Sequence, residues 1–201
     1  MSTKYFDIIV IGCSSGGFET LCLVLPSLPE NFGVPIVVVS HLSDDSGGLL
    51  TELLAKRCAM PVCEVKDKSR LMPGNIHVAP CGFHLLLEVD LSFSLNVDAK
   101  VCGARPSINV LFETVADAIG SRVIGVILTG SNNDGANGLR VISNAGGFGI
   151  VQNPETAYAA EMPSAAVTAG GASAVVPVSG IPSLLIDLVR CGRSILQKQE
   201  K

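Results

Sequence analysis

Short apolar segments alternate with longer mixed segments along most of the chain. Ile8 to Ile11 are four consecutive β-branched residues, bounded by Asp7 and Gly12. Such a short continuous run is typical of a strand that is buried on both faces of a parallel sheet. The longer segments have the length of helices. We predict strands at 6–12, 34–40, 61–66, 74–79, 123–129, 147–152 and 173–177, and helices at 17–28, 46–58, 106–119, 135–145, 160–170 and from about 180.

Residues 84–97 interrupt this alternation. The runs 84–89 and 92–97 are both strand-like and meet at Asp90-Leu91, which predicts a hairpin. Repeated strand–helix units predict a parallel sheet. The predicted fold is therefore α/β and doubly wound, with a mostly parallel sheet, helices on both faces and an inserted antiparallel β-hairpin. In such a sheet, sites form from the loops that follow the strands.

The length and composition limit the classes of protein to which this chain can belong. The chain has 201 residues, of which 48% are hydrophobic, and its mean hydropathy is +0.48. This length suits a single domain, which we predict over residues 1–201. The apolar runs are far shorter than the roughly 20 residues of a membrane span, and the first residues lack a secretory signal segment. We therefore expect a cytoplasmic protein without membrane insertion.

The net charge and the positions of the cysteines argue against several kinds of partner and cofactor. The net charge is −4 without a cluster of lysines and arginines, which disfavours nucleic acid and anionic membranes. The seven cysteines form no Cys-x-x-Cys motif and do not pair with histidine in the sequence. In a reducing compartment we expect them to be small buried apolar residues. We expect neither a metal nor an organic cofactor.

Three polar loops follow predicted strands. In the first, Gly12-Cys13-Ser14-Ser15-Gly16-Gly17, a glycine-rich turn leads from a strand into a helix. The second predicted strand delivers His41, and the strand at 123–129 is followed by Asp134. At one edge of a sheet these three side chains can act as nucleophile, general base and orienting acid in acyl transfer. Each alone is more often a turn or capping residue, so only their joint placement favours catalysis.

Two other uses of the first loop fit less well. A dinucleotide fingerprint needs glycine where the chain has Ser14, and an acid where it has Ser40-His41. The loop does match the Gly-x-Ser-x-Gly pattern of α/β-hydrolases. In those enzymes the histidine comes last, whereas every histidine here precedes Asp134. The order serine, histidine, aspartate leaves a different class of serine hydrolase.

Further motifs extend along the chain. The segments are residues 11–17, His41, 71–74 (Leu-Met-Pro-Gly), 78–80 (Val-Ala-Pro), 105–112 (Arg-Pro-Ser-Ile-Asn-Val-Leu-Phe), 125–130, 133–135 (Asn-Asp-Gly), 152–153 and 162–163. In this order they resemble the catalytic domain of the chemotaxis receptor methylesterases, the CheB family. The resemblance implies hydrolysis of glutamate methyl esters on the cytoplasmic helical region of methyl-accepting chemotaxis receptors. It also implies deamidation of receptor glutamines as a related activity.

The resemblance implies roles for single residues. The family's catalytic serine, histidine and aspartate fall on Ser14, His41 and Asp134. Ser15 stands where a threonine hydroxyl usually supports the histidine. The other expected roles are oxyanion stabilisation near Ser15, Ser131 and Asn132, substrate contact at Arg105 and Met162, and a structural role for His77 and His84. For Arg105, pairing with a nearby surface acid is an equal alternative.

Several positions depart from the family pattern. His41 is followed by Leu-Ser-Asp-Asp instead of Met-Pro, and Ser131, Ala104 and Glu161 replace other usual residues. We expect these positions to rim the cleft and to affect substrate choice. Asp44 and Asp45 are expected to raise the pKa of His41 or to repel an acidic receptor surface. The departures leave open a non-catalytic binding module or an esterase for another substrate.

Many family members carry an N-terminal receiver domain that covers the active site. The first predicted strand of this chain begins within a few residues of Met1. We therefore expect a standalone catalytic domain with a constitutively open site. Its control would come from the expression level, a separate regulatory partner or a tether outside this sequence.

Overall fold

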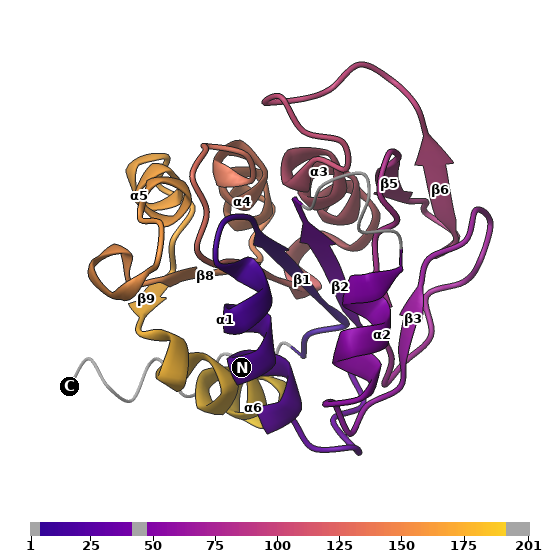
Figure 1. Ribbon diagram of the computed structural model, residues 1–201, viewed down its shortest axis with the longest axis horizontal. Coiled ribbons are helices and arrows are strands. Elements are labelled where there is room, and N and C mark those ends of the chain that lie inside the picture. Colours follow the sequence, from indigo (N-terminus) through magenta and orange to yellow (C-terminus); the bar gives the residue numbers. More distant parts are fainter. Residues whose placement is uncertain (1–4, 42–47, 192–201) are drawn as a thin grey trace.

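The computed structural model describes residues 5–41 and 48–191. Its main sheet has seven parallel strands in the order β3-β4-β2-β1-β7-β8-β9, and β5 and β6 form a separate antiparallel pair (Figure 1). The doubly wound α/β prediction is confirmed. The strands are β1 Ile8–Cys13, β2 Ile36–Ser40, β3 Val62–Glu64, β4 Ile76–Val78, β5 His84–Leu87, β6 Phe93–Asn96, β7 Val123–Ile127, β8 Phe148–Gln152 and β9 Ala174–Val176.

Helices cover both faces of the main sheet (Figure 1). They are α1 Gly17–Val24, α2 Leu49–Ala55, α3 Ile108–Ile119, α4 Ala136–Asn144, α5 Glu161–Thr168 and α6 Ile181–Cys191. Side chains alternate along β1, so that Ile9 and Ile11 pack with the core beneath α1, α2 and α6. Ile8 and Val10 belong to the core beneath α3, α4 and α5. Because β1 is buried on both faces of the sheet, its sequence is a continuous run of apolar residues.

Several predicted helix boundaries differ from the structure, and two of the differences involve proline. The predicted helix 17–28 changes at Leu25 into the 3-10 turn Leu25–Ser27, because Pro26 has no N–H to continue the α-helical hydrogen bonds. Pro106 was expected in the first turn of its helix, but α3 begins at Ile108 and Ser107 is its N-cap residue. Further 3-10 turns lie at Gly120–Arg122, Pro154–Thr156 and Val178–Gly180.

Two further predictions concern the burial of the cysteines and the lack of membrane-spanning segments. Of the seven cysteines, Cys13 is buried, four are partly buried, and Cys102 and Cys191 are exposed, so the expectation of buried cysteines is wrong for these last two. Across residues 5–41 and 48–191, no helix is both long and apolar enough to span a membrane.

Gly12 allows α3 to approach β1 closely. A Cβ at this position would meet the Ile108 side chain, with its Cδ1 atom 2.8 Å away. We expect Gly12→Ala to lower the free energy of unfolding by about 1–3 kcal/mol, the usual cost of overpacking a core. Urea denaturation measures this loss. The matched control is Gly180→Ala, whose Cβ would be 3.8 Å from Val176, and an equal effect of the two substitutions would contradict the packing argument.

Candidate active site

The three candidate catalytic residues come from neighbouring strands. β1 lies between β2 and β7, with Cys13 paired with Ser40 and Gly12 paired with Ile127. The residues after these strands therefore meet at one edge of the sheet. The backbone N–H of His41 donates to the carbonyl of Cys13 at 3.0 Å, which joins the second loop to the first.

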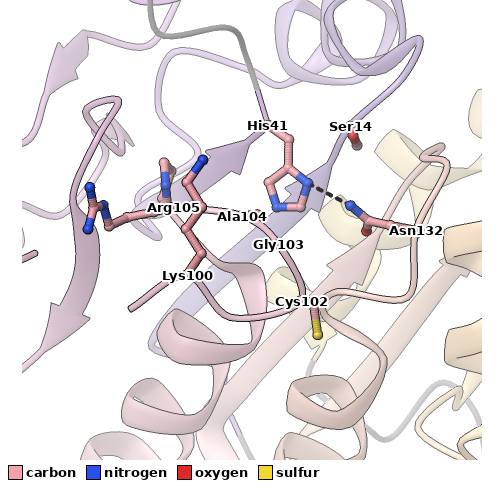
Figure 2. A pocket seen from close by; sticks show the side chains of 9 residues that line it. Ser14, His41, Lys100, Cys102, Gly103, Ala104, Arg105 and Asn132 are labelled. Carbon is pink, nitrogen blue, oxygen red and sulfur yellow. Dashed lines mark hydrogen bonds between the residues drawn. The ribbon is translucent and has the colours of Figure 1, made fainter. Parts of the chain in front are cut away.

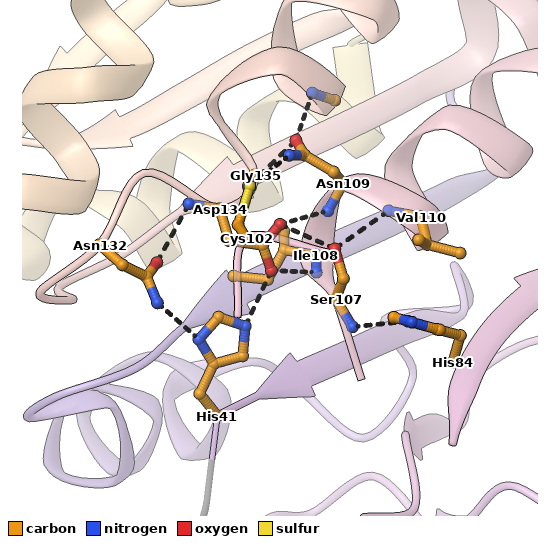
Figure 3. A network of polar contacts seen from close by, with 11 residues as sticks. His41, His84, Cys102, Ser107, Ile108, Asn109, Val110, Asn132, Asp134 and Gly135 are labelled. Carbon is orange, nitrogen blue, oxygen red and sulfur yellow. Dashed lines mark hydrogen bonds and ion pairs between the residues drawn. The ribbon is translucent and has the colours of Figure 1, made fainter. Parts of the chain in front are cut away.

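His41 forms a hydrogen bond with Asp134. Its Nε2 atom is 2.9 Å from Oδ2 of Asp134, which is fully buried. On the other side of the ring, the Asn132 side-chain amide donates to Nδ1 at 3.2 Å (Figures 2 and 3). A neutral His41 therefore carries its proton on Nε2 and its lone pair on Nδ1. Compared with the serine protease arrangement, the two ring nitrogens exchange roles.

Asp134 is held at the N-terminus of α3 (Figure 3). Its carboxylate accepts from the backbone N–H groups of Ile108, at 2.7 Å, and Asn109, at 3.1 Å, and from the Ser107 hydroxyl at 2.8 Å. Burial acts to raise the pKa of Asp134, but these hydrogen bonds and the one from His41 hold the pKa below its ordinary value. The positive end of the helix dipole also favours an anion here. The site thus contains an ionised carboxylate that orients the histidine.

The lowered pKa of Asp134 predicts a pH-dependent contribution to stability. The ionised carboxylate stabilises the folded state fully above the pKa of the unfolded chain, and this contribution is lost as the pH falls through the folded pKa. We expect wild type to exceed Asp134→Asn in free energy of unfolding at neutral pH, and the difference to shrink below about pH 4. Urea unfolding of both proteins between about pH 7 and pH 3 measures it. A difference that is constant over this range would contradict the network in Figure 3.

Ser14 and His41 line the same pocket, which has a volume of about 220 Å³ (Figure 2). The backbone of Ser14 is fixed by a hydrogen bond from its N–H to the carbonyl of Thr129, at 2.9 Å. Within the described residues, no hydrogen bond joins its hydroxyl to His41. Catalytic hydrogen bonds are often long without substrate and shorten in the reacting complex.

The neighbouring Cys13 is an unsuitable nucleophile. Its side chain is buried, and burial raises the pKa of the thiol to about 12. A thiol attacks as its thiolate, which is scarce at such a pKa. Of the two adjacent side chains, only that of Ser14 lines the pocket.

The remaining predicted site residues have different positions. The Ser15 hydroxyl lies 2.8 Å from that of Ser131, and Asn132 is the residue that contacts His41. Met162 was expected to contact the substrate, and this is wrong, because its side chain is fully buried and packs beneath Gly130. Arg105 lines the pocket, but its Nη1 atom donates to backbone carbonyls instead of to an acid. Its contact with substrate stays a prediction.

Ala104 lines the pocket, as expected for a rim position. Asp44 and Asp45, for which effects on His41 were predicted, lie outside the described residues.

Sequence reasoning missed the residues that support Asp134. Ser107 and Asn109 occur in a quoted motif, yet neither received a role. The buried Asn109 side chain accepts from the N–H groups of Gly135, at 3.1 Å, and Gly138, at 2.7 Å, and so joins α3 to the start of α4. The buried side chain of Gln152 likewise accepts from the N–H of Thr129 at 2.9 Å. The signal that could have identified these residues is a polar side chain at a core-facing position of a predicted helix or strand.

The other two histidines are buried and bonded to the backbone. His84 donates from Nε2 to the carbonyl of Ala99 at 3.0 Å and accepts at Nδ1 from the N–H of Ser107 at 3.2 Å. His77 accepts at Nε2 from the N–H of Met72 at 3.1 Å. His84 thereby fixes the residue whose hydroxyl reaches Asp134.

Known proteins are similar to this chain in sequence. A "Putative protein-glutamate methylesterase/protein-glutamine glutaminase" of Leptospira interrogans is 42% identical over 183 residues, which are 91% of this chain and 95% of that protein. The "Protein-glutamate methylesterase FrzG" of Myxococcus xanthus is 34% identical, and the match covers 92% of this chain and 55% of that protein.

A solved structure agrees with the sequence matches. The crystal structure of the Thermotoga maritima CheB methylesterase catalytic domain has a TM-score of 0.89 and 35% identity, and the match covers 92% of this chain and 99% of that one. The protein-family model described as CheB methylesterase matches residues 9–185. The chain therefore belongs to the CheB methylesterase family.

Proposed function

We propose that this protein is a serine esterase that hydrolyses the γ-methyl esters of glutamate side chains on methyl-accepting chemotaxis receptors. One observation carries the proposal: Ser14 shares a pocket with a histidine that a buried carboxylate holds in the tautomer of a general base. The names of its relatives support the substrate class. The cytoplasmic helical region of the receptors is the proposed partner, which places the activity in the cytoplasm.

In the first half of the reaction, Ser14 Oγ attacks the carbonyl carbon of the ester. Nδ1 of His41 accepts the hydroxyl proton, and Asp134 stabilises the resulting imidazolium through Nε2. The same Nδ1 then gives this proton to the departing methanol as the carbon–oxygen bond breaks. The product of this half is an acyl-enzyme at Ser14.

In the second half, water attacks the acyl carbon and His41 accepts its proton. Collapse of the tetrahedral intermediate breaks the bond to Ser14 and returns the proton to Oγ, leaving a glutamate side chain. A glutamine side chain follows the same route, with ammonia as the leaving group. No proposed step uses a metal or an organic cofactor.

Asn132 must move during this reaction. In the structure its amide occupies the Nδ1 lone pair that has to receive the Ser14 proton. When the ester enters, Ser14 takes that hydrogen-bonding position and the Asn132 amide becomes available to the ester oxygen. Together with backbone N–H groups near Ser15 and in the loop at Ser131, it supplies the proposed oxyanion hole.

The decisive experiment for this function is methanol release from methylated receptors. Receptor membranes carrying radiolabelled methyl groups are incubated with the purified protein, and volatile label is counted. We expect release by wild type, together with conversion of receptor glutamine to glutamate in mass spectra. Binding to receptors without methanol release would favour a non-catalytic module, and release from small esters alone would favour another substrate.

A further inference from the structure

A strap of residues 97–105 borders the pocket and has a fixed backbone. Nη1 of Arg105 donates to the carbonyls of Val97, at 2.8 Å, and Asp98, at 3.0 Å. His84 donates to the next carbonyl, that of Ala99. A tight turn closes the other end, where Val101 and Ala104 exchange backbone hydrogen bonds of 3.1 and 3.0 Å. The residues on both sides of Lys100 are therefore anchored.

Lys100 presents a positive charge to the pocket. It is exposed and lines the same cavity as Ser14 and His41 (Figure 2). Within residues 5–41 and 48–191 it has no ion pair, and the described residues that line this cavity include no carboxylate. The guanidinium of Arg105 is bonded to the strap and points away from His41 in Figure 2. Lys100 is thus the cation whose ammonium is available to a ligand.

Before hydrolysis, the reacting group of the substrate carries no negative charge that could pair with the Lys100 ammonium. A γ-methyl ester and a glutamine amide are both neutral, so a nearby ammonium gains little from either. A substrate protein can supply a carboxylate only from another side chain beside the ester. Complementary charges at the edge of a binding site select partners and set their register.

We propose that Lys100 makes the enzyme select glutamyl esters that have an acidic side chain close by on the substrate. This inference rests on the proposed function and adds to it the local sequence of the target. Holding the product carboxylate is the competing role for Lys100, and the experiment distinguishes the two.

The test compares peptides and protein variants. Each fluorescent peptide has a central γ-methyl glutamyl residue, flanked on both sides either by glutamates or by alanines. A third peptide has alanine flanks and a free central glutamate, the product. Their dissociation constants are measured by fluorescence anisotropy with Ser14→Ala protein, with and without Lys100→Met. Lys56→Met is the matched control, because Lys56 lies outside the pocket and pairs with Glu52 on α2.

We expect Lys100→Met to weaken binding of the glutamate-flanked ester about two- to five-fold, as partly exposed charge pairs do, and to leave the alanine-flanked ester unchanged. The effect should diminish at high salt. Lys100→Glu should make the alanine-flanked ester the better ligand, and Lys56→Met should change neither.

Equal weakening of both esters, no weakening, or weakening of the product peptide alone would overturn the proposal. Methanol release from the same peptides by the protein with Ser14 intact tests the proposed function separately. Its absence would count against the esterase, while the binding measurements would still decide the role of Lys100.

Discussion

Replacing Asp134 by Asn should reduce turnover by about 10⁴-fold, the loss seen when other triads lose this carboxylate. The geometry gives the reason. The Asn109 N–H and the Ser107 hydroxyl both donate to Oδ1 of Asp134, so the side-chain oxygen of Asn takes this position. Its NH₂ group then faces Nε2 of His41 and forces the ring proton onto Nδ1. The lone pair that should accept the Ser14 proton is lost.

Asp98→Asn is the matched control for this substitution. Asp98 is exposed on the strap, and its backbone carbonyl, which the change preserves, is the group that accepts from Arg105. We expect little effect on turnover at saturating substrate. Methanol release, with circular dichroism to compare folding, measures both variants, and similar losses in the two would show that the orienting acid is misassigned.

Replacing Ser14 by Ala should reduce ester hydrolysis by about 10³-fold or more, because triad residues act as a unit. The hydroxyl makes no hydrogen bond in the described part of the chain, so the substitution should leave stability nearly unchanged. Substrate binding should also persist, since the pocket keeps its other lining residues. Methanol release and urea denaturation measure the two effects.

Ser15→Ala provides the comparison for Ser14→Ala. It removes a neighbouring hydroxyl that, in the described part of the chain, forms a hydrogen bond with Ser131 and not with His41. We expect a far smaller loss of turnover than at position 14. If Ser14→Ala retains near wild-type turnover, or if only Ser15→Ala is inactive, Ser14 is not the nucleophile.

The sequence predicted the sheet and the loops that carry the site. Buried strands such as β1 are evident as apolar runs, and the carboxyl ends of neighbouring parallel strands necessarily meet at one edge. This is why Ser14, His41 and Asp134 were found together without knowledge of their distances. The helix start at Ile108 was less evident, because Pro106 and Ser107 are both acceptable near a helix N-terminus.

Side-chain partners were predicted less well, because they depend on contacts between distant loops. Asp134 was considered a cap for its own helix, yet its carboxylate accepts from the N-terminus of α3, 26 residues earlier in the sequence. The sequence also could not show which nitrogen of His41 faces Asp134, or that Asn132 occupies the other one. Met162 was misplaced because a methionine near a cleft can equally pack beneath it.

Covalent labelling with a fluorophosphonate tests most directly whether His41 activates Ser14. Such a reagent loses fluoride when an activated serine hydroxyl attacks its phosphorus atom. After digestion and mass spectrometry of wild type, we expect the phosphonyl mass on the peptide that contains Ser14, and its loss in both Ser14→Ala and His41→Ala. Labelling of another residue, or undiminished labelling of Ser14 in His41→Ala, would contradict this account.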